Sequence, residues 1–172
     1  MNAGGTTLAE GGGMQDNTCR MHDNTSRPAV RASLHADHRE LDSLLQRLMF
    51  AFKTNAGDEI DRLWGEFESR LLAHMEAEEK YLVPCLRRSH PGEIERLLEE
   101  HGLLRKKLLE FGTQLELHLT RLEIMRSLAS ALHAHASHED RLYEWADSEL
   151  AGKERSSLFS AIAHRTLSLV HR

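Results

Sequence analysis

Six side chains in this sequence have the chemistry and the spacing of metal ligands. They are His38, His74, Glu78, His101, His135 and Glu139. Each glutamate follows a histidine by four residues, which is one turn of a helix. Imidazole nitrogens and carboxylate oxygens together suit iron, and they also accept zinc or manganese. The six residues are therefore candidates for a protein-bound metal centre.

Each candidate ligand interrupts a run of apolar residues that recur at intervals of three and four, as on the core-facing side of a helix. The four runs cover residues 34–52, 67–85, 97–111 and 128–142. Burying imidazole and carboxylate groups in an apolar core is unfavourable unless a charged partner binds there. The pattern predicts an all-α protein, an up-down-up-down four-helix bundle with a metal site in its core.

The turns of such a bundle can be located independently. Residues at one level of an up-down bundle are equally far from the turn between them, so each turn should lie midway between successive histidines. The midpoints are Ala56, the Arg87–Arg88 pair and His118. All three are next to helix-breaking or helix-starting sequence, in 54–58 (TNAGD), 89–92 (SHPG) and the capping-box segment 120–123 (TRLE). The spacing therefore predicts one ligand layer shared by four helices.

The remaining sequence is assigned around the bundle at residues 28–150. Residues 1–27 are rich in Gly, Asn and Thr, lack an apolar period, and are expected to form a flexible tail. Ser26 and Pro28 suit the start of the first helix. Residues 151–172 restart a helical pattern after Ala151–Gly152, with Leu158 and Ile162 on its apolar side. This accessory helix is expected to pack on the bundle or to join subunits of a homo-oligomer.

Composition limits the partners of the chain. Its 172 residues carry a net charge of −5, with basic and acidic residues interleaved, so no nucleic-acid footprint is present. No segment approaches the run of about 20 apolar residues that a membrane span requires, and no signal peptide is evident. Cys19 and Cys85 are not expected to pair, as in a reducing compartment. A cytoplasmic protein without a membrane partner is the expectation.

The segments around the four histidines resemble the hemerythrin-like, or HHE cation-binding, family. They are residues 37–41 (DHREL), 74–79 (HMEAEE), 99–104 (EEHGLL) and 135–140 (HASHED). The resemblance covers about residues 32–145. It implies a non-haem centre of two iron ions, carboxylate- and oxo- or hydroxo-bridged, with the four histidines as ligands and with Glu78 and Glu139 as the bridging carboxylates.

The sequence departs from this family in one position. Hemerythrins that carry oxygen place a fifth histidine one turn after the ligand of the third helix, and here that residue is Arg105. Its guanidinium would oppose a dicationic centre unless it turned outward or paired with an anion. A reversible oxygen carrier is therefore not expected. Asp140 stays an alternative to Glu139, because some hemerythrins use the five-residue offset from His135.

Two functional hypotheses follow. In one, the protein binds or senses a small diatomic ligand such as oxygen or nitric oxide, or an oxidant, or handles iron. In the other, it is a di-iron enzyme or an iron-delivery protein that reduces peroxide or nitric oxide or repairs iron centres. No residue is assigned as a catalytic acid or base, and the sequence does not decide between the two mechanisms. The competing structural hypothesis is a metal-free bundle, in which burial and repulsion would raise the pKa values of Glu78 and Glu139.

Several neighbours of the ligands are also assigned. Glu79 and Glu100 adjoin candidate ligands without sharing their helix face and are expected in solvent. His138 is expected to face outward. Tyr143 is expected either to donate a hydrogen bond to a bridging carboxylate or to serve ordinary packing.

Overall fold

The computed structural model describes residues 29–119 and 122–168, with side chains up to Ile162. Within these residues the chain forms five α-helices and no strand. The helices are α1 Val30–Thr54, α2 Gly57–Leu86, α3 Pro91–Glu116, α4 Leu122–Glu149 and α5 Gly152–Ser168. Every helix in the described part of the chain is too short or too polar to span a membrane. The all-α prediction is confirmed.

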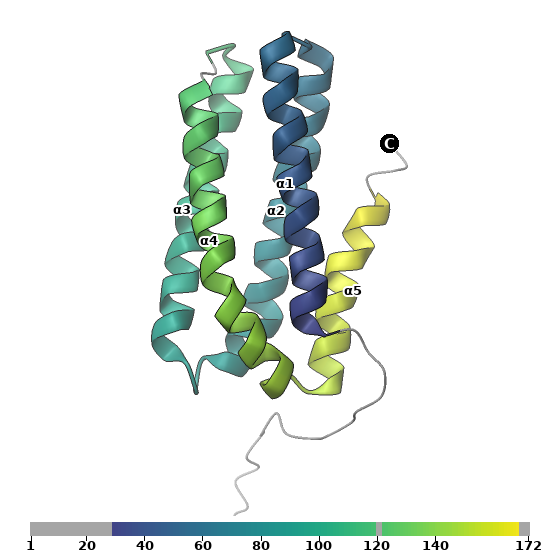
Figure 1. Ribbon diagram of the computed structural model, residues 1–172, viewed down its shortest axis with the longest axis vertical. Helices are drawn as coiled ribbons and strands as arrows, with labels where there is room; N and C mark the ends of the chain where they lie inside the picture. Colours follow the sequence, from purple (N-terminus) through teal and green to yellow (C-terminus); the bar gives the residue numbers. More distant parts are fainter. Residues whose placement is uncertain (1–28, 120–121, 169–172) are drawn as a thin grey trace, which may run out of the picture.

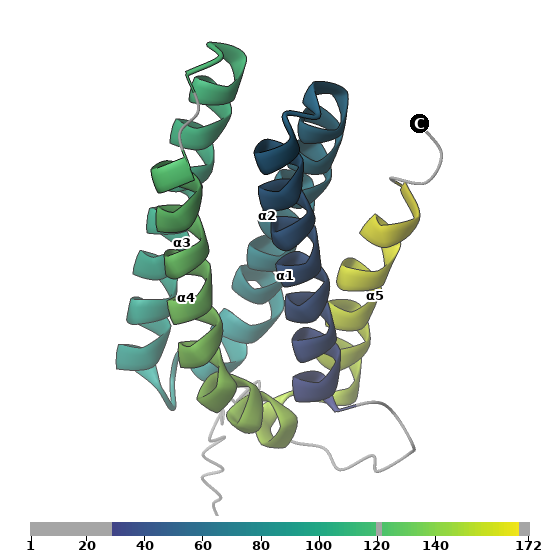
Figure 2. The same ribbon diagram turned by 45° about the horizontal axis from the view of Figure 1, so that its top comes forward.

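The first four helices form an up-down-up-down bundle (Figures 1 and 2). Around its perimeter α1 contacts α2 and α4, and α3 contacts the same two helices. The fifth helix lies outside the bundle against α2 and α1. Its Leu158 is fully buried against the bundle. The predicted additional C-terminal helix is therefore present and packs on the bundle.

The turns fall where the spacing of the histidines predicted them. The first helix is followed by Asn55, whose φ of 54° is left-handed, and α2 begins two residues after Asn55. Pro91 is the first residue of α3, where its missing N–H costs nothing. The third helix ends before His118, which is also left-handed with φ 55°. The predicted helix start at Ser26 and Pro28, the predicted tail, and Thr120–Arg121 lie outside the described residues.

A carboxylate from a distant helix caps α1. The side chain of Ala29, which precedes the helix, has no capping group, but the backbone N–H of Val30 donates to Asp147 Oδ1 of α4 at 2.6 Å. A carboxylate at this end satisfies a free N–H group and complements the helix dipole. This contact joins the start of the bundle to its last helix.

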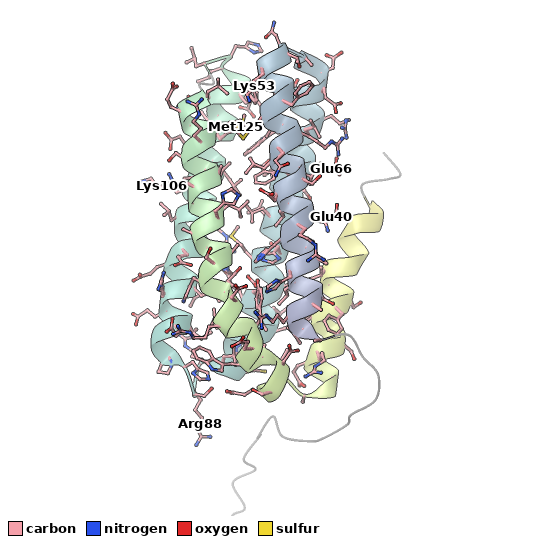
Figure 3. All side chains as sticks on the ribbon, viewed as in Figure 1. Glu40, Lys53, Glu66, Arg88, Lys106 and Met125 are labelled. Carbon is pink, nitrogen blue, oxygen red and sulfur yellow. The ribbon has the colours of Figure 1, made fainter. Side chains whose placement is uncertain are left out.

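The apolar core is divided into two clusters. The first includes Leu41, Phe67, Phe111 and Met125, and it fills the half of the bundle near the α1–α2 turn, where Figure 3 labels Met125. The second fills the opposite half, toward Arg88 in Figure 3. Its members include Leu34, Leu82, Leu97 and Leu142, and the partly buried Cys85 packs against it. All four bundle helices contribute to both clusters, so each helix crosses a gap between them.

Candidate metal centre

The gap between the two clusters is filled by the six predicted ligands. Glu78, His101 and Glu139 are wholly buried, and His74 and His135 keep 1% of their surface. The His38 side chain is the most accessible, at 15%. The structure therefore brings all six residues into one polar layer. In four of them, His74, Glu78, His135 and Glu139, the ligand atoms lie within 4.8 Å of one another.

The histidines form two pairs, and Glu139 extends between them. The Nε2 atoms of His38 and His74 are 3.0 Å apart, and the rings of His101 and His135 lie 4.9 Å apart, centroid to centroid. Glu139 Oε2 is 3.0 Å from His38 Nε2, whereas its Oε1 is 2.9 Å from His135 Nε2. One carboxylate thus offers one oxygen to each pair, as a bridging ligand does.

Glu78 also faces both pairs. Its Oε2 lies 3.5 Å from His74 Nε2 and 3.3 Å from His101 Nε2. Its Oε1 accepts a hydrogen bond from the Tyr143 hydroxyl at 2.6 Å, and that hydroxyl is 2.9 Å from Glu139 Oε2. Tyr143 thus has the hydrogen-bonding role that was one of the two expectations for it.

Four atoms of the layer test whether a metal ion fits there. His101 Nε2, His135 Nε2, Glu78 Oε2 and Glu139 Oε1 are buried and make no hydrogen bond within the described residues. Buried polar atoms without partners are costly and rare in native proteins. These atoms face one another at ion-pair distances of 2.9–3.8 Å. A cation among them would satisfy all four at once.

The His38–His74 pair gives a second indication. Two nitrogen ligands of one ion, each about 2.1 Å from it, are about 3 Å apart when they subtend a right angle at the metal. The 3.0 Å separation of the two Nε2 atoms is compatible with that arrangement. The donor set and its spacing fit a metal centre.

A second set of carboxylates orients the buried histidines. The Nδ1 atoms of His74, His101 and His135 lie 2.9, 2.7 and 3.2 Å from Asp37, Glu79 and Glu100, respectively. Each of these carboxylates belongs to the helix that precedes its histidine in the chain. A ring that donates its Nδ1–H to a carboxylate keeps the Nε2 lone pair for a metal. The three rings are thus held with Nε2 toward the layer.

The expectations for Glu79, Glu100 and His138 were wrong. The two glutamates support histidines, and only 6% of the His138 side chain is exposed. Its Nδ1 lies 3.0 Å from Glu100, and its Nε2 lies 2.8 Å from Glu93. Helical periodicity places these residues just beside the core face of their helix. In a bundle, side chains at such positions contact the neighbouring helix and are therefore partly shielded from solvent. An acidic residue directly next to a predicted ligand is the signal that would have found Glu79 and Glu100.

Arg105 pairs with an anion, which is one of the two ways in which the sequence analysis expected its charge to be tolerated near a metal. Its Nη1 and Nη2 atoms lie 2.7 and 3.0 Å from the two oxygens of Glu79. The structure also separates Glu139 from Asp140. Glu139 lies in the layer, whereas the Asp140 side chain is 54% exposed and faces His35 at 2.9 Å.

Burial and the neighbouring groups shift the pKa values of His101 and Glu139 in opposite directions. Burial lowers the pKa of the His101 imidazole, but nearby carboxylates, Glu139 and Glu78 foremost, outweigh it and raise this pKa to about 9. Burial raises the pKa of Glu139, but His101 and the other three histidines lower it well below its ordinary value. The net shift of the Glu139 pKa is therefore opposite to the raised value expected for a metal-free bundle, because the four histidines outweigh burial. A proton on the His101 imidazole supplies positive charge that a metal cation would replace.

Comparison with known proteins identifies one matching family. Residues 29–146 match the family described as hemerythrin HHE cation binding domain. Neither the curated proteins nor the solved structures gave a match. The matching segment includes the whole polar layer and ends within α4, so it does not include α5.

Proposed function

The chain belongs to the hemerythrin HHE cation-binding family, and from this premise we propose that its polar layer holds two iron ions that bind a small diatomic ligand or an oxidant. The proposed ligands are His38, His74, Glu78, His101, His135 and Glu139. The observation that carries the proposal is the set of four buried imidazole and carboxylate atoms that face one another without hydrogen bonds within the described residues.

Two ions are proposed because the layer has two halves. His38 and His74 form one pair of imidazoles, and His101 and His135 form the other. The oxygens of Glu139 face different pairs. Iron is proposed over zinc or manganese because the family resemblance favours it, although the mixed nitrogen and oxygen donors suit all three metals.

The protein's own contribution is to hold the donors and to exclude water. Bound iron would supply redox chemistry and open positions for oxygen, nitric oxide or peroxide. The apolar clusters on both sides shield the layer, and Tyr143 directs its hydroxyl at Glu78. Arg105 supplies no fifth imidazole, which supports binding or sensing of the ligand over reversible oxygen carriage.

The test measures iron per chain in protein expressed with iron, followed by optical spectra before and after oxygen is admitted. About two irons per chain, with near-ultraviolet bands that change in oxygen, are expected. His74→Ala should lose the iron, whereas His133→Ala, on an exposed histidine of α4 paired with Asp42, should retain it. Absence of iron from the unsubstituted protein would refute the proposal. Consumption of many equivalents of peroxide or nitric oxide would instead indicate an enzyme.

A further inference from the structure

Three groups from two helices form a continuous hydrogen-bonded chain that ends in the polar layer. Arg105 on α3 donates to both oxygens of Glu79 on α2, at 2.7 and 3.0 Å. The same Oε1 lies 2.7 Å from Nδ1 of His101, one turn before Arg105 on α3. The α2 carboxylate is therefore held from two sides by residues of a single helix.

The geometry of this chain fixes the carboxylate. A guanidinium that donates through two nitrogens holds the plane of a carboxylate as well as its position, which a single hydrogen bond does not. Rotation of Glu79 would break two hydrogen bonds to Arg105 and the contact with His101. Because Oε1 is fixed, the Nδ1–H that donates to it fixes the plane of the imidazole. The Nε2 atom of His101 is then directed toward Glu78, 3.3 Å away.

This arrangement differs from an ordinary surface ion pair. Exposed pairs contribute little, because both side chains stay hydrated and mobile. Glu79 is instead in contact with a wholly buried imidazole. The Arg105 side chain, which is 37% exposed, lies between Glu79 and solvent.

We propose that Arg105 and Glu79 are positioning residues that set the affinity of the centre for its metal through the orientation of His101. The inference rests on the proposed metal-binding function. Arg105 then has a positive role at the position where oxygen-carrying relatives have a histidine: it fixes an outer carboxylate in place of supplying a ligand. Because it acts through Glu79 alone, its effect must vanish when Glu79 is absent.

A double-mutant cycle tests this dependence. The dissociation constants of Fe(II), measured without oxygen by chelator competition, are compared for the unsubstituted protein, Glu79→Ala, Arg105→Gln and the double variant. Loss of a carboxylate that supports a ligating histidine typically weakens metal binding by about 10- to 100-fold, and this is expected for Glu79→Ala. Arg105→Gln should weaken binding by a smaller factor. The double variant should match Glu79→Ala, because the two residues act in series.

Lys106→Gln is the matched control. It removes the same charge from the next residue of α3, which lies exposed on the outside of the bundle (Figure 3). Binding by this variant should be unchanged. Co(II) absorption gives a second readout, because its visible bands should change in Glu79→Ala and Arg105→Gln but not in Lys106→Gln. Unfolding of each metal-free variant shows whether the fold is retained.

The outcomes separate this inference from the proposed function. If the unsubstituted protein binds neither Fe(II) nor Co(II), the proposed function fails and the inference fails with it. If that protein binds both ions but Arg105→Gln behaves like Lys106→Gln, only the positioning role is overturned. A double variant weakened by the product of the two single effects would also overturn it, since Arg105 would then act independently of Glu79.

Discussion

Replacing Asp37 with alanine should destabilise the bundle even without metal. Asp37 is 4% exposed, and its Oδ1 accepts a hydrogen bond from Arg70 Nε at 2.8 Å. Its Oδ2 lies 2.9 Å from His74 Nδ1. The Asp37→Ala change would leave a guanidinium and an imidazole without their partner. The Arg70 side chain is only 16% exposed, so water would replace the lost carboxylate incompletely.

The magnitude follows from these contacts. Breaking a buried ion pair by removing one partner costs about 3–5 kcal/mol, and a hydrogen bond to a charged group contributes about 1.5–3 kcal/mol. Because Arg70 keeps some access to water, the lower part of that range applies, and we expect a loss of about 3 kcal/mol in the free energy of unfolding. For a chain of this size, that corresponds to a fall of roughly 10 °C in Tm.

Thermal and urea unfolding of the metal-free protein, followed by circular dichroism in the presence of a chelator, would measure the loss. Glu59→Ala is the control, because it breaks a similar carboxylate–guanidinium pair with Arg62 in an exposed place. That variant should unfold like the unsubstituted protein. Equal stability of Asp37→Ala and Glu59→Ala would refute the argument that burial gives the Asp37 contacts their strength.

Three further predictions concern the metal and the fold. Removing iron with a chelator should lower the free energy of unfolding. The expected loss is about 2.7 kcal/mol relative to protein at a free iron concentration 100 times Kd. Equal stability with and without metal would favour a metal-free bundle. Metal binding at pH 7 should release protons, and metal affinity should rise as the pH increases toward 9. The reason is that the pKa of His101 is raised to about 9 in the metal-free layer, so the cation must displace that proton. Titration calorimetry in two buffers of different ionisation enthalpy would contradict this if the binding enthalpy did not depend on the buffer. Asp147→Ala should lower the free energy of unfolding in urea by about 1 kcal/mol, because it removes the cap from the N–H of Val30. Ser148→Ala, a change at an exposed neighbour, is the control. A loss for Asp147→Ala no larger than that for Ser148→Ala would contradict the capping role.

The bundle and its polar layer were predictable because both depend on local patterns. Apolar residues at intervals of three and four define which face of each helix is buried, and Asn55 and Pro91 end or begin helices through their own backbone preferences. Equal spacing from the turns then brings the histidines to one level. None of these steps requires knowledge of how neighbouring helices rotate against each other.

The supporting contacts depend on that rotation, which is why the sequence did not reveal them. Whether Glu100 reaches solvent or the imidazole of His135 depends on the angle between α3 and α4 and on the rotamer of a long side chain. Likewise, Glu139 and Asp140 differ by about 100° around one helix. The periodicity favoured Glu139, and the five-residue offset of some hemerythrins kept Asp140 open until the packing of α4 was known. The Asp147 cap of α1 joins residues 117 positions apart and has no sequence signature.

Each carboxylate that orients a buried histidine lies on the helix immediately before that histidine in the chain. Asp37 of α1 supports His74 of α2, Glu79 of α2 supports His101 of α3, and Glu100 of α3 supports the histidine of α4. During synthesis, each helix therefore emerges with the anchor for the helix that follows it. A nascent chain that has made only α1 and α2 presents two imidazoles and one carboxylate of the six donors. The complete centre forms only after the last bundle helix has docked, which couples stable metal capture to the end of folding and limits trapping of ions by unfinished chains.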